Sequence, residues 1–280
     1  MKLNKNILAA LSVVLCLSGC LTTSSPEGRH TLAQSLATGM TEKYIEAAPF
    51  QLTSWQKLGT ENAEANVYIE GDGLAWVTRN KISNNPTPSD PIALRLAARD
   101  PAPNVIYLAR PCQYSGRVDG NLCDETYWTR GKTSTDVIQS YMRALDILKQ
   151  VHNLTGFNLI GYSGGAAVAV LVAGQRDDVR SVRTVAGNIS YQTFDSLHNV
   201  TPADESIDPM TAANSLMNIP QVHFIGGEDD IVPAGIYQAW AAAVAENRCL
   251  QSATVPGVSH QKGWESHWPE LLTNPAPGCR

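Results

Sequence analysis

The stretch that decides the fold is Phe157-Asn158-Leu159-Ile160-Gly161-Tyr162-Ser163-Gly164-Gly165-Ala166-Ala167. It begins with an apolar segment typical of a buried strand, continues through Gly-x-Ser-x-Gly, and ends in an Ala- and Val-rich segment typical of a helix. Small residues around the serine allow a turn too tight for larger side chains, which leaves the hydroxyl free at the strand end. A flexible glycine loop is the alternative. The strand before the turn and the helix after it favour a nucleophile elbow at Ser163.

The composition is that of a globular protein with a full hydrophobic core. Of 280 residues, 43% are hydrophobic and 17% are charged, so one catalytic-size domain is the simplest expectation. The formal net charge is -5, and loss of a leader containing Lys2 and Lys5 makes the chain more negative. A negative chain gives no electrostatic basis for nucleic-acid binding, so we expect no nucleic-acid partner.

The amino terminus has the pattern of an export signal. Lys2 and Lys5 precede an apolar run from Ile7 to Leu17, which is short for a permanent membrane span. The run ends in Leu17-Ser18-Gly19-Cys20, which resembles the lipobox of bacterial lipoproteins. That resemblance implies removal of residues 1–19 and lipid modification of Cys20, with several acyl chains holding the protein to a membrane. An ordinary secretory leader is the alternative.

The expected compartment is the bacterial cell envelope. Leu21, in place of Asp, follows Cys20, and in bacterial lipoproteins this implies the outer membrane where the host has two membranes. Four cysteines remain in the exported part, and they are Cys112, Cys123, Cys249 and Cys279. An even number in an oxidising compartment favours disulfides, although four cysteines permit three pairings. We favour Cys112 with Cys123 and Cys249 with Cys279, and neither pair has the C-x-x-C spacing of a zinc or redox site.

Strands and helices alternate along the rest of the chain. We expect a polar tether over 21–30, an amphipathic helix over 31–47 and an antiparallel strand over 49–58. Further strands are expected over 66–69, 104–109, 157–160, 182–186, 221–225 and 251–255, with helices over 91–99, 135–152, after Ser163, and over 234–245. This alternation predicts a mostly parallel sheet with helices on both faces and functional groups at the carboxyl ends of the strands.

From about Pro49 to Leu272 the chain resembles the α/β-hydrolase superfamily, with several motifs in that family's order. The loop Arg110-Pro111-Cys112-Gln113-Tyr114 is similar to that of a group of exported bacterial lipoprotein hydrolases. The resemblance implies an α/β-hydrolase domain over 49–280, preceded by a lipidated tether and N-terminal helix over 20–48. It also implies a short cap segment between Gly187 and Pro220, and no metal or other cofactor.

The resemblance implies a nucleophilic serine, an acid and a histidine in that order, and Ser163 takes the first place. The acid follows the expected strand over 221–225, where Asp229 and Asp230 are both candidates. The family's usual acid lies four residues before the proline that is Pro233 here, which selects Asp229. Either carboxylate could instead cap the helix that begins near Pro233.

His260 lies just past the last expected strand, where the family places the base. His267 is the alternative, and we expect it to pack on a helix. The resemblance implies that the backbone amides of Gly164 and Asp72 hold the oxyanion, the latter within Glu70-Gly71-Asp72-Gly73, where the family often has His-Gly. A tight turn that needs these residues for its own geometry is the alternative.

The activity implied is cleavage of an ester, and less favoured an amide or peptide bond, through an acyl-enzyme. The cap segment is too short for a large lid, which favours a modest ester or acyl substrate over a long-chain lipid. Trp76, Gln113 and Tyr114 are expected near the site, with packing the favoured role for Trp76. Two alternatives stay open: an acyltransferase, and a catalytically silent lipoprotein that uses the scaffold for binding. The pattern leaves the oligomeric state open.

Overall fold

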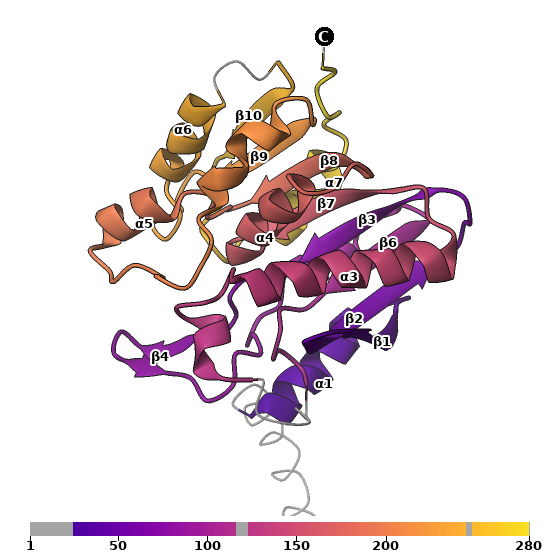
Figure 1. Cartoon of the computed structure of the whole chain (residues 1–280), viewed down its shortest axis with the longest axis horizontal. Coiled ribbons are helices and arrows are strands. Elements are labelled where there is room, and N and C mark those ends of the chain that lie inside the picture. Colours follow the sequence, from indigo (N-terminus) through magenta and orange to yellow (C-terminus); the bar gives the residue numbers. More distant parts are fainter. Residues whose placement is uncertain (1–24, 116–122, 245–247, 280) are drawn as a thin grey trace, which may run out of the picture.

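One eight-stranded sheet organises the chain in the computed structural model, which describes residues 25–115, 123–244 and 248–279 (Figure 1). The spatial order is β1-β2-β6-β3-β7-β8-β9-β10. The strands are β1 (Thr41–Ala47), β2 (Phe50–Leu58), β3 (Glu64–Ile69), β6 (Asn104–Leu108), β7 (Gly156–Tyr162), β8 (Val179–Val185), β9 (Gln221–Gly226) and β10 (Leu250–Val255). This confirms the predicted central sheet.

Within this sheet β2 runs against its neighbours, pairing antiparallel with β1 and β6. The pairs from β6 through β3, β7, β8 and β9 to β10 are all parallel. Parallel strands covered on both faces need apolar residues throughout, and every residue of β6 is buried. The carboxyl ends of β3, β7, β9 and β10 therefore meet at one edge, where the loops that follow them come together.

Helices cover both faces of the sheet, as predicted. One face carries α3 (Thr135–His152), α4 (Gly164–Ala173), α6 (Ala234–Ala243) and the 3-10 helix η3 (Pro209–Leu216). The other carries α1 (Pro26–Leu36), α2 (Ile92–Ala98) and α7 (Trp264–Leu271). The short cap contains α5 (Tyr191–His198), and η2 (Glu125–Trp128) precedes α3.

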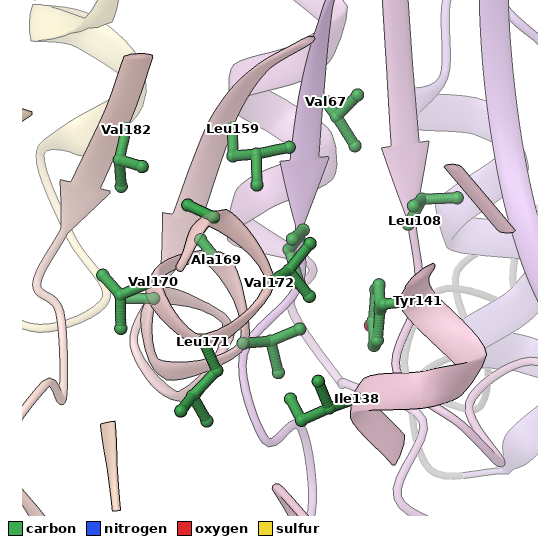
Figure 2. Close-up of a cluster of buried hydrophobic side chains, with 14 of the residues drawn as sticks. Val67, Leu108, Ile138, Tyr141, Leu159, Ala169, Val170, Leu171, Val172 and Val182 are labelled. Atoms are coloured by element: carbon green, nitrogen blue, oxygen red, sulfur yellow. The ribbon is translucent and has the colours of Figure 1, made fainter. Parts of the chain in front are cut away.

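Helix α4 is buried along its whole length. Figure 2 shows it between the sheet, represented by Leu159 and Val182, and the side chains of Ile138 and Tyr141 on α3. A helix packed on every side cannot shift without opening cavities in a close-packed core. The amino end of α4, where Ser163 precedes the first helical residue, is therefore held in place.

The expected helix over 31–47 is wrong. Helix α1 begins at Pro26, inside the expected tether, and ends at Leu36, whereas Thr41–Ala47 is the edge strand β1. Gly39 has φ +74° and turns the chain between them, a conformation that glycine adopts readily. The backbone groups at the edge of β2 find their hydrogen-bond partners in β1, and this pairing decides against a longer helix.

A two-stranded hairpin was also not expected. It consists of β4 (Trp76–Thr78) and β5 (Lys81–Ile82), which pair antiparallel between β3 and α2. The two strands are too short to show a period in the sequence.

Both favoured cysteine pairings are present as disulfides, Cys112 with Cys123 and Cys249 with Cys279. The second joins the start of β10 to the carboxyl-terminal tail. The expected leader and Cys20 lie outside the described residues. Among the residues that are described, no helix combines the length and apolarity needed to cross a membrane.

Candidate active site

Ser163 lies in a sharp turn between β7 and α4. Its backbone angles are φ +51° and ψ -119°, which a residue with a side chain rarely adopts. The turn tolerates no bulk around the serine, because a Cβ at Gly161 would lie 2.4 Å from Ala166 Cα and one at Gly165 2.3 Å from the Ile69 carbonyl oxygen. The structure thus has the strand, elbow and helix predicted for the Ser163 segment.

The structure brings Ser163, His260 and Asp229 together at the carboxyl edge of the sheet. Ser163 Oγ lies 3.0 Å from His260 Nε2, and His260 Nδ1 lies 2.9 Å from Asp229 Oδ2. The tautomer with its proton on Nδ1 donates to Asp229 and leaves Nε2 free to accept the serine proton. Only 8% of His260 and 5% of Asp229 are exposed, so bulk water screens this series little.

Asp229 both orients His260 and holds its own loop. Its Oδ1 accepts hydrogen bonds from the amides of Ile231 and Val232, at 2.9 Å and 2.7 Å, while Oδ2 faces the histidine. The neighbouring Asp230 is exposed. Capping of the loop and contact with the histidine therefore fall to the same carboxylate, Asp229.

Two side chains that the sequence did not single out hold the backbone of His260. The Tyr162 hydroxyl and the Trp264 indole N–H both donate to the His260 carbonyl oxygen, at 3.0 Å and 2.9 Å. Tyr162 immediately precedes the serine, and Trp264 begins α7. The same loop is tied to the acid loop, where the Glu228 amide donates to the Val258 carbonyl at 2.9 Å.

The Glu70-to-Gly73 loop lies against the turn that contains Ser163. A Cβ at Gly71 would lie 3.3 Å from Ser163 Cβ, and a Cβ at Gly164 would lie 2.0 Å from Asp72 Oδ1. The loop after β3 and the first residue of α4 are thus in direct contact. The loop that carries Asp72 therefore lies beside Ser163 through Gly71 and meets Gly164 through the Asp72 carboxylate.

Two cations hold the Asp72 side chain. Arg110 Nη1 donates to its Oδ1 at 3.0 Å and Lys132 Nζ to its Oδ2 at 2.9 Å. Burial by itself favours the protonated acid, but the two nearby cations outweigh it and lower the pKa of Asp72. Gln113 also holds this loop by donating to the Gly71 carbonyl at 3.0 Å. Lys132 gave no sequence signal, because it lies 60 positions from Asp72 in a loop without a motif.

Glu70 is a carboxyl group buried beneath this loop, with 1% of the residue exposed. It accepts hydrogen bonds from the Gly71 amide at 2.9 Å, the Tyr107 hydroxyl at 3.2 Å and the Ala93 amide at 3.4 Å. Burial disfavours the charged carboxylate more than these hydrogen bonds favour it. The pKa of Glu70 is therefore raised to about 7. The side chain is therefore an internal support of the loop that changes its charge near neutral pH.

Of the other five histidines, four have hydrogen-bond partners, namely His30, His198, His223 and His267, and His152 ends α3. His223 is buried between Thr184 and Gln221, and burial lowers its pKa to about 3, so it stays neutral. His267 binds the Gly263 carbonyl on α7, as expected for a packing residue, whereas His198 ends α5 and His30 lies in α1. In the described parts of the chain, no group of three His, Cys, Asp or Glu residues could hold a metal ion.

The cap segment borders the site on one side. Lys132 Nζ lies 4.9 Å from the centre of the Tyr191 ring. This contact links the ion pair of Lys132 and Asp72 to α5. Leu197, on the same helix, is 54% exposed. The expected packing role for Trp76 is wrong, because this side chain is 46% exposed on the β4–β5 hairpin.

Replacement of Glu70 by Gln is expected to make stability less dependent on pH. The folded pKa of about 7 lies above the ordinary value of 4.5, so the folded wild type binds more protons between these values and loses stability as pH rises through them. The resulting penalty at pH 8, about 3 kcal/mol, is absent in the variant. Urea unfolding at pH 5 and pH 8 measures it, with exposed Glu61→Gln as control. If the free energy of unfolding differs between wild type and Glu70→Gln by the same amount at pH 5 and at pH 8, the raised pKa of Glu70 is contradicted.

Comparison with known proteins places this arrangement in a family. The model described as "Serine hydrolase (FSH1)" matches residues 102–254, more than half of the chain. The Pyrococcus furiosus esterase Pf2001 is similar in structure, with a TM-score of 0.60 and 15% identity over 87% of this chain and 94% of that one. Est1E from Butyrivibrio proteoclasticus gives 0.59 and 12%, over 82% and 95%.

A Pyrococcus horikoshii acylaminoacyl peptidase is also similar, with a TM-score of 0.57 and 12% identity over 85% of this chain and 40% of that one. No curated protein sequence gives a significant match. At such low identity the solved structures establish the fold, and the family model establishes the kind of protein. The chain has the α/β-hydrolase fold and belongs to the FSH1 serine hydrolase family.

Proposed function

We propose that the protein cleaves a carboxylic ester through an acyl-enzyme formed on Ser163. The observation that carries this proposal is the hydrogen-bonded series from Ser163 Oγ through His260 to Asp229, at 3.0 Å and 2.9 Å. A serine hydroxyl is a weak nucleophile at neutral pH, and this series supplies the base that it needs and the carboxylate that orients the base.

In the first half of the reaction, Ser163 Oγ attacks the ester carbonyl carbon and His260 Nε2 takes the hydroxyl proton. The carbonyl π electrons move to its oxygen, and the protonated imidazole is stabilised by Asp229 Oδ2. When the tetrahedral intermediate collapses, the C–O bond to the alcohol breaks and the alcohol oxygen takes the proton from His260. The products of this half are a free alcohol and an ester on Ser163.

The amides of Gly164 and Asp72 stabilise the oxyanion in this proposal. Such donors are effective when they are already aimed at the developing charge and do not reorganise during the reaction. The support for this role is the direct contact of Asp72 with Gly164, together with the ion pairs that Asp72 makes with Arg110 and Lys132. Both partners of Asp72 act here as positioning residues.

In the second half, water attacks the acyl-enzyme while His260 Nε2 accepts one of its protons. The bond to Ser163 Oγ breaks, the serine recovers the proton from His260, and a carboxylic acid leaves. An alcohol in place of water would give acyl transfer by the same steps. The short α5 cap favours a modest acyl group. An ester is preferred to a peptide because amide resonance makes a peptide carbonyl less electrophilic than an ester carbonyl.

A fluorophosphonate probe is expected to label the wild type and to leave Ser163→Ala unlabelled, because the probe reacts with an activated serine. Both proteins are then screened on esters of increasing acyl length and on peptide substrates, with circular dichroism confirming that the variant is folded. Turnover of esters by the wild type alone supports the proposal. A folded wild type that neither takes up the probe nor turns over any ester is evidence for the binding scaffold instead.

The two adjacent acids provide a matched test of the mechanism. Asp229→Asn is expected to lower kcat by about 10³- to 10⁴-fold, because a neutral amide neither fixes the productive histidine tautomer nor stabilises the imidazolium. Asp230→Asn is expected to retain wild-type kcat, since this exposed side chain is outside the series. Steady-state kinetics on the ester found above measures both. Wild-type kcat in Asp229→Asn, or a large loss of kcat in Asp230→Asn, excludes Asp229 as the acid that orients His260.

We further propose that Cys20 carries acyl chains that hold the enzyme to the cell envelope, in the outer membrane where the host has two membranes. The support is the lipobox pattern that ends at Cys20 after an apolar run. Cells expressing the wild type and fed radiolabelled palmitate are expected to incorporate label into the protein, and Cys20→Ala is expected to incorporate none. Mass spectrometry of the amino-terminal peptide identifies the site. An unmodified Cys20 in the mature wild type refutes the anchor.

A further inference from the structure

We propose that the β4–β5 hairpin docks onto a lipid surface that contains anionic headgroups, with Trp76 and Val77 entering the interface. This inference uses the proposed anchor at Cys20 to say which end of the protein faces the membrane.

The hairpin displays apolar side chains to solvent, and no element within the described residues covers them. Trp76 is 46% exposed and Val77 is 53% exposed. Each of the other five tryptophans is at most 8% exposed, and they are Trp55, Trp128, Trp240, Trp264 and Trp268. Tryptophan is favoured where a membrane meets water, because its ring has an apolar body and a polar N–H. Trp76 therefore differs from the rest in a way that fits an interfacial contact.

The charge of the hairpin is opposite to that of the chain. Arg79 and Lys81 are exposed next to the apolar residues, and no Asp or Glu occurs over 73–89, whereas the chain carries a formal net charge of -5. Cations at a membrane surface are attracted to anionic lipids. The nearby acids are Asp124, the N-cap of η2, and Glu125, its first residue; η2 reaches the hairpin through Trp128, whose indole N–H donates to the Ser83 carbonyl at 3.1 Å. We assign the insertion to Trp76 and the preference for anionic lipid to the two cations.

The hairpin and the start of α1 lie at the same end of the molecule, the lower end in Figure 1. The link runs through Tyr114, whose ring lies 5.9 Å from that of His30 on α1 and whose amide donates to Thr87 Oγ1 at 2.8 Å. Thr87 follows Pro86, whose carbonyl accepts from the Leu74 amide at 3.0 Å and so closes the base of the hairpin.

The anchor point is close to this end along the chain. Cys20 precedes Ser25, the N-cap of α1, by five residues. Even fully extended, such a segment spans about 17 Å. A lipidated Cys20 therefore keeps the start of α1 near the membrane, and a second contact at the hairpin would fix the orientation that a single tether leaves free. Because the hairpin continues from the Glu70-to-Gly73 loop, this orientation turns the carboxyl edge of the sheet, where Ser163 lies, towards the lipid.

Fluorescence of Trp76 tests the proposal in the mature protein isolated from membranes. The protein is mixed with vesicles of phosphatidylcholine and phosphatidylglycerol that carry a doxyl quencher just below the headgroups, and bound protein is recovered by flotation. Because the remaining tryptophans are buried, we expect doxyl quenching in the wild type that is lost in Trp76→Phe. Acrylamide quenching of Trp76 is expected to fall on vesicle binding.

The matched control moves the probe to the opposite edge of the sheet. Val151 is 64% exposed in the last turn of α3, so Val151→Trp in the Trp76→Phe background is expected to show no doxyl quenching. The double variant Arg79→Gln, Lys81→Gln is expected to lower the wild-type preference for phosphatidylglycerol over pure phosphatidylcholine vesicles.

Each possible failure has a distinct outcome. In one outcome, wild type floats with vesicles while Trp76 is still quenched by acrylamide and is not quenched by doxyl lipid. That result overturns the hairpin contact and favours a protein partner for this surface. Wild type that does not float at any lipid concentration overturns it as well. The mass of the amino-terminal peptide separately reports the state of Cys20, and fluorophosphonate labelling of Trp76→Phe separately reports the hydrolase.

Discussion

Close backbone contact between the β7–α4 turn and the end of β3 is the constraint on which the rest of the structure depends. Gly165 meets the Ile69 carbonyl so closely that no Cβ fits between them. The contact forces Ser163 into a left-handed conformation, which costs about 1–3 kcal/mol. Burial of every residue of α4 stabilises the fold and more than offsets that strain. The serine is thus held at the strand end because the helix behind it cannot move.

The same contact explains why so much polar structure is buried beside the site. The loop that follows Ile69 touches Gly164 through Asp72, and Arg110 and Lys132 hold that carboxylate. Buried ion pairs add little net stability, because desolvation of both charges opposes their attraction. In the proposed mechanism their effect is positional, since amides that stabilise an oxyanion must be oriented before the reaction begins.

Elements with a long, regular pattern were predictable from the sequence. The helix expected over 135–152 has the observed bounds, and the strand expected over 104–109 ends one residue early. The helix expected over 31–47 failed because Thr41–Ala47 pairs with β2, a contact between segments whose local pattern is ambiguous. The β4–β5 hairpin has no period to detect, and Trp76 is exposed against its usual preference for burial.

The sequence by itself determined the strand-elbow-helix around Ser163, because this is a local pattern. The expected order of serine, acid and histidine came from the resemblance to the α/β-hydrolases. The resemblance favoured Asp229 over Asp230, but only the tertiary structure shows that Asp229 faces His260 and that the histidine reaches a serine 97 positions away. The same holds for Arg110 and Lys132 on Asp72, and for Tyr162 and Trp264 on the His260 carbonyl. The physical reason is that a hydrogen bond needs two atoms at about 3 Å. Packing of the sheet and its helices sets such distances between remote segments.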